Sequence, residues 1–257
     1  MKCLLFADFC NTTLFKLNKM KLDIVAFGAH PDDVELGCSG TILKEISLGK
    51  TVGIVDLTRG ELGTRGSAEI RDQEANAAAK ILGVKVRENL EMRDGFFVNA
   101  EKHQLEIIKM LRKYQPEIVL CNAVDDRHID HGKGSKLVSD ACFLSGLTRI
   151  ETELDGVQQQ AWRPKLVYHY IQWKNSTPDF VVDITGFTEK KIASILAYSS
   201  QFYDPSSKEP ESPISSKNFL ESLNYRSRDL GRLVGVEHAE GFTVERYLAV
   251  NSLGDLK

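Results

Sequence analysis

The fold is organised around the stretch Ala29-His30-Pro31-Asp32-Asp33-Val34-Glu35-Leu36, which directly follows the apolar run Ile24 to Phe27. The apolar run predicts a buried strand, and the residues from Val34 to Leu48 follow helical spacing. A histidine and two carboxylates therefore lie where a strand ends and a helix begins. This point is the usual mouth of an open α/β sheet, where ligands bind.

The spacing inside this stretch suits a metal. His30 and Asp33 are three residues apart, so one turn of backbone can bring an imidazole nitrogen and a carboxylate oxygen to one point. Asp32 lies between them and faces differently, so it can reach a water on the metal and act as a general base. The same residues also fit an ordinary helix start, because proline is common there and carboxylates offset the helix dipole.

A second cluster favours the metal site. It follows the predicted strand Pro116 to Cys121, precedes a predicted helix from Lys136 to Leu144, and reads Asp125-Asp126-Arg127-His128-Ile129-Asp130-His131-Gly132. If the two strands are neighbours, the two clusters face each other across the mouth of the sheet. His131 then completes a two-histidine, one-carboxylate zinc set with His30 and Asp33, which leaves positions open for water and substrate.

Composition limits the classes of protein that fit. With 257 residues and 42% hydrophobic content, the chain can bury one full core, which favours one α/β domain over two. The formal net charge of -3 provides no basic field for nucleic acid or an anionic membrane, and no apolar run is long enough to span a bilayer. Five widely spaced cysteines without a CxxC pair favour a reducing cytoplasm over a disulfide scaffold.

Residues 1–19 differ from the remainder of the chain. They contain a short apolar patch that lacks a small-residue cleavage site, so a secretory signal is the less favoured interpretation. Met20-Lys21-Leu22-Asp23 forms a natural start directly before the first strand. We interpret residues 1–19 as a frayed or non-native extension and predict a single domain over residues 20–257.

The other predicted elements alternate between strand and helix in the first half of the chain. They are strands Val52 to Leu57 and Val84 to Arg87, and helices Ala68 to Leu82 and Glu101 to Tyr114. This alternation predicts a Rossmann-like, mostly parallel sheet with helices on both faces. The glycine-rich loop 58–66 is expected at the rim of the site.

Beyond Asp155 the pattern becomes rich in loops. We expect strands at 165–170, 180–182 and 244–250, and helices at 188–199 and 218–233. Between these helices, residues 201–218 hold three prolines and many serines, which predicts a lid or a contact rather than a simple connection. The second half is therefore a loop-rich C-terminal extension of the sheet.

With both clusters considered, the sequence resembles the PIG-L-like (LmbE-like) zinc-dependent N-acetylglucosamine deacetylases. Their signatures are a strand-end His-Pro-Asp-Asp and a later His-x-Asp-His, here at His30 to Asp33 and His128 to His131. The resemblance runs from about Leu22 to the C-terminus. It is strongest to the bacillithiol-pathway branch, which deacetylates N-acetylglucosaminyl malate, and the supporting stretches are residues 57–64, 71–74, 200–203, 228–231 and 239–242.

The resemblance implies roles for two groups of residues in the reaction. The implied metal ligands are His30, Asp33 and His131. Asp32 is the implied general base. His128 is the implied stabiliser of the intermediate with Asp130 as its acidic partner, although Asp130 could instead orient His131. The implied cofactor is Zn²⁺, and the same ligands also suit Fe²⁺.

Three further residues are implied substrate contacts. Arg71 matches an arginine that holds a polar aglycone, Asp94 matches an acid that binds sugar hydroxyls, and Arg127 is a weaker candidate. This division fits their chemistry, because guanidinium pairs bidentately with carboxylates whereas a carboxylate accepts from hydroxyls. The implied partner is a small N-acetylglucosamine conjugate, and relatives of this type commonly form homo-oligomers.

Two other functions remain open at this point. A doubly wound sheet with a glycine-rich loop could bind a nucleotide, but His-Pro-Asp-Asp stands where the GxGxxG fingerprint would lie, and carboxylates repel pyrophosphate. The chain could also be an amidase, or a deacetylase of a different N-acetyl sugar.

Overall fold

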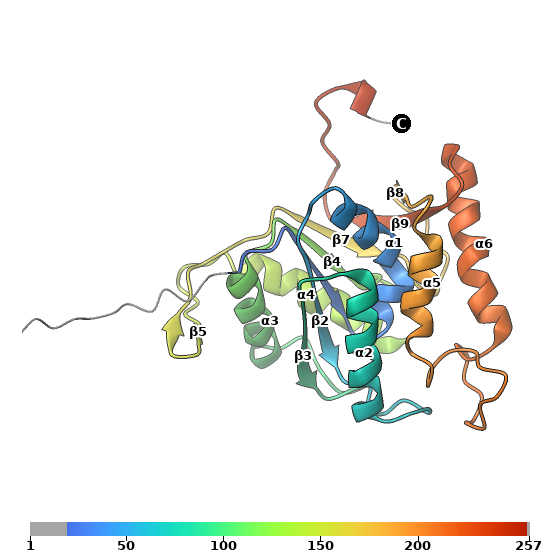
Figure 1. Ribbon diagram of the computed structural model, residues 1–257. Coiled ribbons are helices and arrows are strands. Elements are labelled where there is room, and N and C mark those ends of the chain that lie inside the picture. The colour runs from blue at the N-terminus through green and yellow to red at the C-terminus, as the bar shows by residue number, and fades with distance from the viewer. Residues whose placement is uncertain (1–19, 256–257) are drawn as a thin grey trace, which may run out of the picture.

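A computed structural model describes residues 20–255, so the extension predicted at residues 1–19 lies outside the described residues. At its centre is a seven-stranded sheet of order β3-β2-β1-β4-β7-β9-β8 (Figure 1). The strands are β1 Ile24–Gly28, β2 Val52–Thr58, β3 Val86–Met92, β4 Ile118–Cys121, β7 Leu166–Tyr170, β8 Phe180–Asp183 and β9 Ala239–Val244. The strands from β3 to β7 in this order pair in parallel, and β9 is antiparallel to both neighbours. The predicted Rossmann-like, mostly parallel sheet is confirmed.

Helices cover both faces of this sheet (Figure 1). They are α1 Asp33–Ser47, α2 Ala68–Leu82, α3 Glu101–Tyr114, α4 Ile129–Leu144, α5 Thr188–Leu196 and α6 Lys217–Val234. A hairpin of β5 Glu153–Leu154 and β6 Val157–Gln158 and the short 3₁₀ helix η1 Leu253–Asp255 complete the elements. Alternation along β1 explains the two cores, since Phe27 packs in one core with α3 and α4, and Ala26 in another with α1.

Three predicted boundaries are wrong, and one of them is that of β3, which runs over Val86–Met92 rather than Val84 to Arg87. Helix α4 begins at Ile129 rather than Lys136, because the His128 side chain accepts a hydrogen bond from the Asp130 backbone N–H and caps the helix. The second cluster therefore lies in the first turn of a helix. The last strand is β9, not residues 244–250, because the buried Glu240 ion-pairs with Lys191 and so belongs to a strand that its charge disguises in the sequence.

The register of the sheet places both clusters at one edge. β1 and β4 are hydrogen-bonded neighbours that run in parallel, with Ile24 opposite Ile118. Their carboxyl ends therefore meet, as the predicted convergence of the two clusters requires.

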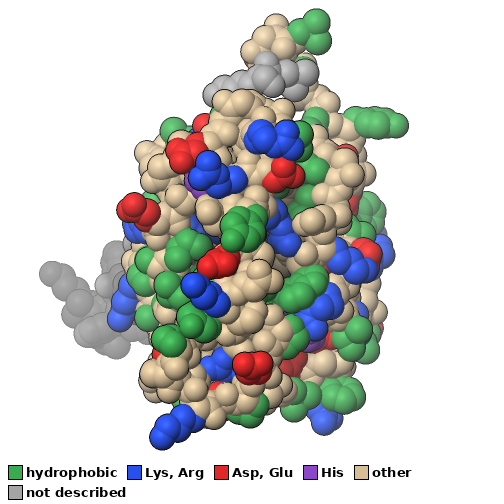
Figure 2. Space-filling model, turned by 90° about the vertical axis from the view of Figure 1, so that its right-hand side faces the viewer, with side chains coloured by type: hydrophobic (Ala, Val, Ile, Leu, Met, Phe, Trp, Pro, Cys, Tyr) green, Lys and Arg blue, Asp and Glu red, His purple; other side chains and the backbone are tan. Residues whose placement is uncertain are grey.

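The outer surface is mixed in character where it is seen in Figure 2. On this face acidic, basic and hydrophobic side chains are interspersed. Within residues 20–255, no helix has both the length and the apolar composition needed to span a membrane.

Candidate active site

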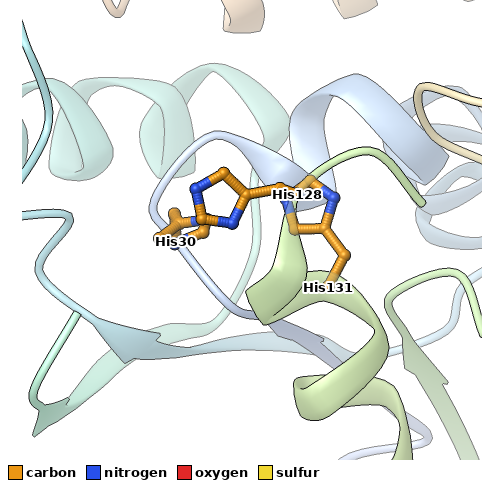
Figure 3. Close-up of side chains that lie close together, drawn as sticks. All are labelled: His30, His128 and His131. Atoms are coloured by element: carbon orange, nitrogen blue, oxygen red, sulfur yellow. The ribbon is translucent and has the colours of Figure 1, made fainter. Parts of the chain in front are cut away.

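Three histidines meet at the carboxyl edge of the sheet. His30 lies in the loop after β1, and His128 and His131 lie at the start of α4 (Figure 3). The ring centroid of His30 is 4.5 Å from that of His128 and 5.6 Å from that of His131. One ring nitrogen from each of the three lies within 4.8 Å of the other two. Loops from two distant parts of the chain thus bring several electron-pair donors to one point.

Asp33 lies between two of these rings. Its Oδ1 is 3.1 Å from His131 Nε2, and its Oδ2 is 3.5 Å from His30 Nδ1. Burial by itself raises the pKa of Asp33, but the charge of His131 and the hydrogen bonds of both histidines hold that pKa well below its ordinary range. The structure therefore brings the predicted set of His30, Asp33 and His131 together, with the carboxylate ionised.

Side chains behind this set fix its orientation. Asn122 Nδ2 donates to Asp33 Oδ2 at 2.9 Å, and Gln172 donates to Asp33 Oδ1. His131 Nδ1 lies 2.6 Å from Asp126 Oδ2, which leaves His131 Nε2 directed at Asp33. A carboxylate on the far nitrogen of a ligating histidine sets its tautomer and strengthens its basicity.

Within residues 20–255, the Asp32 side chain makes no hydrogen bond with this set, although it lines the same cavity. Asp32 precedes α1, yet its side chain makes no capping hydrogen bond, so the alternative of an ordinary helix start does not describe it. Its φ of 114° lies in the left-handed region, a strained conformation for a residue with a side chain. Arg71 Nη2 donates to its Oδ2 at 3.0 Å. Burial, opposed by the Arg71 charge, raises the pKa of Asp32 to about 7.

The carboxylate of Asp130 has different partners from those expected. It accepts hydrogen bonds from Gly95 N at 2.7 Å and Lys133 Nζ at 3.0 Å, and its Oδ2 lies 3.5 Å from His30 Nε2. His131 is oriented by Asp126 instead. Although burial opposes ionisation, these contacts lower the pKa of Asp130.

Within residues 20–255, no carboxylate hydrogen-bonds to the His128 ring, although the charges of Asp33 and Asp130 act on it. Its Nδ1 accepts from the Asp130 backbone N–H at 3.2 Å, so a neutral ring carries its proton on Nε2. Burial and the nearby charges of His30 and His131 lower the pKa of His128. The ring caps α4 and lies beside two other histidines, so the predicted pairing of His128 with the Asp130 carboxylate is not seen.

A cavity of about 340 Å³ is lined by His30, Asp32, Asp33, His128 and His131. The predicted substrate residues Arg71, Asp94 and Arg127 line it as well. Asp94 Oδ1 lies 3.1 Å from His30 Nε2, and the Arg127 guanidinium stacks 4.6 Å from the Trp173 ring centroid. The C-terminal half of the chain adds apolar residues to the lining, namely Trp173, Pro213, Ile214, Phe219 and Leu223.

Sequence reasoning missed several residues that position the site. Asp126 belongs to the quoted second cluster, and a carboxylate five residues before a ligand histidine was a usable signal. Asn122 follows β4 directly and also accepts from the Ala29 N–H at 2.8 Å, joining the two strand ends. Gln172 carries no such signal, because only the register of β7 against β4 brings it to Asp33.

The donor set fits a divalent cation. Two imidazoles and a carboxylate with further open positions are the ligands of catalytic zinc sites, and Fe²⁺ accepts the same atoms. Burial opposes charge on His131, but Asp33 and Asp126 outweigh it and raise the pKa of that ring to about 9. The site thus favours positive charge at the point where a bound cation would supply it.

Comparison with known proteins adds independent evidence. The family described as PIG-L: GlcNAc-PI de-N-acetylase matches residues 25–142, which include both clusters. The conserved protein TT1542 of Thermus thermophilus has a similar structure, with a TM-score of 0.79 and 33% identity over 90% of this chain and 98% of that one. Diacetylchitobiose deacetylase of Thermococcus kodakarensis is 28% identical over 203 residues, 73% of this chain and 74% of that protein.

A third relative catalyses a different type of reaction. The 4-oxalmesaconate hydratase of Pseudomonas putida is 27% identical over 202 residues, 72% of this chain and 76% of that protein. Similarity over most of the chain is thus shared by a deacetylase and a hydratase. Sequence and fold similarity therefore do not determine the reaction, which depends on the residues of the site.

Proposed function

Because the chain belongs to the PIG-L family, we propose that it is a metal-dependent N-deacetylase acting on an N-acetylglucosamine conjugate. The observation that carries the proposal is the meeting of His30, Asp33 and His131 on one side of a cavity that Asp32 also lines. A cation held by the first three groups leaves Asp32 as a separate base. Hydrolysis of an amide needs both of these functions.

The metal would be held by His30, Asp33 and His131, and we propose zinc, with iron(II) as the alternative. When bound, such an ion acts as a Lewis acid that lowers the pKa of water and polarises the acetamide carbonyl. Asn122, Gln172 and Asp126 hold the ligand side chains in place.

Asp32 is the proposed general base. Arg71 donates a hydrogen bond to Asp32 Oδ2. No donor within residues 20–255 contacts Asp32 Oδ1, so this oxygen is free to accept from the attacking water. A pKa of about 7 suits a group that takes a proton from water and then returns it to the departing amine. Arg71 orients this carboxylate and opposes the effect of burial on its pKa.

His128 is the proposed stabiliser of the negative charge that develops on the carbonyl oxygen. With Nδ1 occupied by a backbone N–H, the neutral ring presents Nε2–H as a donor. Removing a donor of this kind typically costs about 2.7–4 kcal/mol of barrier. Asp130 acts on His30 and on the loop at Gly95 rather than on His128.

The proposed substrate is a specific N-acetylglucosamine conjugate. The resemblance supports N-acetylglucosaminyl malate, with glucosaminyl malate and acetate as products in bacillithiol biosynthesis. We propose that Asp94 and Arg127, which line the cavity, contact the substrate there. We place the reaction in the cytoplasm and propose that the chain forms a homo-oligomer, which sedimentation would test.

Acetate release by the zinc-loaded protein tests this function. N-acetylglucosaminyl malate, free N-acetylglucosamine and a mycothiol-like conjugate are compared, with the Asp32→Asn protein as the inactive control. We expect acetate to be released fastest from the malate conjugate. Absence of acetate from all three, together with hydration of oxalmesaconate, would replace the deacetylase proposal with the hydratase reaction of the Pseudomonas relative.

A further inference from the structure

We infer that Arg65 recognises an anionic group, a carboxylate or a phosphate, on the part of the substrate beyond the sugar. The inference rests on the proposed deacetylase function and adds a specificity-determining residue to it. It starts from one juxtaposition: a buried guanidinium that has no carboxylate partner lines the same cavity as the histidine cluster.

Arg65 lies in the glycine-rich loop between β2 and α2, and it is only 5% exposed. Its Nη2 donates to the hydroxyl of Ser207 at 2.6 Å, and its Nε is buried without any hydrogen-bond partner. Within residues 20–255, no carboxylate lies within ion-pair distance of it, although the exposed Asp204 interacts with its charge from farther away. A buried charge with only a neutral partner is costly, and an anionic ligand would offset that cost.

The other two arginines of the cavity are already engaged. Arg71 pairs with Asp32, and it also donates to backbone carbonyls at Pro31 and Gly60. Arg127 stacks on Trp173 and is exposed to solvent. Arg65 is therefore the cavity arginine that combines burial, an unpartnered nitrogen and no carboxylate within ion-pair distance.

The backbone around Arg65 is held in place before any ligand binds. Its carbonyl oxygen accepts from Gln201 Nε2 at 2.8 Å, and Gln201 also donates to Ser200 Oγ at 2.9 Å. Glu74 on α2 in turn accepts from Ser200 N at 2.7 Å. A guanidinium fixed in this way presents a planar pair of donors, which matches carboxylate and phosphate oxygens. Because the loop is already ordered, less conformational freedom is lost when a ligand binds.

A carboxylate and a phosphate would belong to different substrates. A carboxylate would come from an aglycone such as malate, and a phosphate from a sugar phosphate or phosphodiester. A neutral second sugar, as in diacetylchitobiose, supplies neither. We therefore expect this chain to prefer anionic conjugates over neutral ones, with Arg65 as the source of the preference.

Calorimetric binding of deacetylated products tests the inference without turnover. The zinc-loaded protein is titrated with glucosaminyl malate, glucosamine 1-phosphate and neutral methyl glucosaminide. The Arg65→Met protein is expected to bind the favoured anion about 10- to 100-fold more weakly, as loss of a charge-assisted hydrogen bond implies, with the neutral ligand unchanged. Arg65→Lys keeps the charge without the fork, so it should retain part of the preference.

Arg59→Met is the matched control, because Arg59 lies in the same loop but pairs with Asp72 and Glu69 outside the cavity. It should bind all three ligands like the unmodified protein. Equal weakening of anionic and neutral ligands in a normally melting Arg65→Met protein would overturn the inference. So would equal affinity of the unmodified protein for anionic and neutral ligands. Failure of the deacetylase proposal is seen separately, as absence of acetate release.

Discussion

Two buried clusters of charged side chains lie close together in this molecule and differ in composition. The site cluster, which comprises His30, Asp32, Asp33 and His131, lines a cavity. The Arg87 cluster, which comprises Glu35, Asp56, Arg87 and Tyr198, does not. α1 contributes to both, through Asp33 to the first and Glu35 to the second.

Both carboxylates of the Arg87 cluster are paired with a permanent cation, although Glu35 Oε2 has no hydrogen-bond partner. Arg87 donates to Glu35 Oε1 at 2.5 Å and to both oxygens of Asp56 at 2.7 and 2.9 Å. Tyr198 adds a hydrogen bond to Glu35 at 3.2 Å. By contrast, Asp33 in the site cluster pairs with two histidines, whose charge can be exchanged for that of a metal. Burial of charge alone thus does not mark a functional site, whereas histidine-based pairing around a cavity does.

The largest difference between the clusters should appear with Asp32→Asn. This change removes the proposed base and leaves the three metal ligands untouched, so kcat should fall about 10²- to 10⁴-fold while one metal per chain is retained. Acetate release and metal analysis on the same sample check this. If the Asp32→Asn protein deacetylated at the original rate, Asp32 would not be the general base.

Arg87→Met should act on stability rather than on the reaction. It leaves Glu35 and Asp56 buried without their cation, which we expect to lower the free energy of unfolding by about 3–5 kcal/mol. Urea denaturation measures this, with the surface variant Arg59→Met as a control that loses less than about 1 kcal/mol. If folded Arg87→Met protein instead lost catalysis at unchanged stability, the two clusters would not have separate roles.

A smaller effect is expected for Asp126→Asn. The carboxylate orients His131 from behind, so its removal should weaken metal affinity about 10- to 100-fold and leave kcat at saturating metal nearly unchanged. Asp125→Asn is the neighbouring control, because the Asp125 side chain is 77% exposed and, among residues 20–255, pairs only with Lys174. Competition with a metal chelator gives both affinities. Equal affinity in the two variants would mean that Asp126 does not support the metal site.

The smallest effect concerns pH and the Arg87 cluster. Burial, against the charge of Arg87, raises the pKa of Asp56 from its ordinary value of 3.8 to about 6. The folded chain then binds this proton more tightly than the unfolded chain, so the stabilising contribution present below about pH 4 is lost as the pH rises through about 6. Relative to Asp56→Asn, the natural protein should lose roughly 1–3 kcal/mol of stability between those values. Urea titrations at about pH 4, 5 and 6 would show a flat difference if Asp56 were ionised throughout.

Much of the site cluster could be predicted because its chemistry is local in sequence. His30, Asp32 and Asp33 lie within four residues, and periodicity places them at the end of a buried strand. The distant partner His131 was reachable because it follows another predicted strand. Parallel strands bring their carboxyl ends to one edge, so local patterns predict a long-range contact.

The Arg87 cluster and the supporting residues could not be predicted in this way. Arg87 stands at the end of a predicted strand, where a charged residue ordinarily indicates exposure, and only the register of β3 against β2 brings it to Asp56. The predicted pairing of the Asp130 carboxylate with His128 does not form, because the His128 ring caps α4 by accepting from the Asp130 backbone N–H. A capping side chain faces its own helix, which spacing along the sequence does not reveal.

The central claim is that His30, Asp33 and His131 hold one hydrolytic cation. Crystals of the zinc-loaded protein, measured on both sides of the zinc absorption edge, test it most directly. We expect a single anomalous peak bounded by these three side chains, and its loss in His131→Ala. A peak held only by other residues, or none in fully loaded protein, would contradict it.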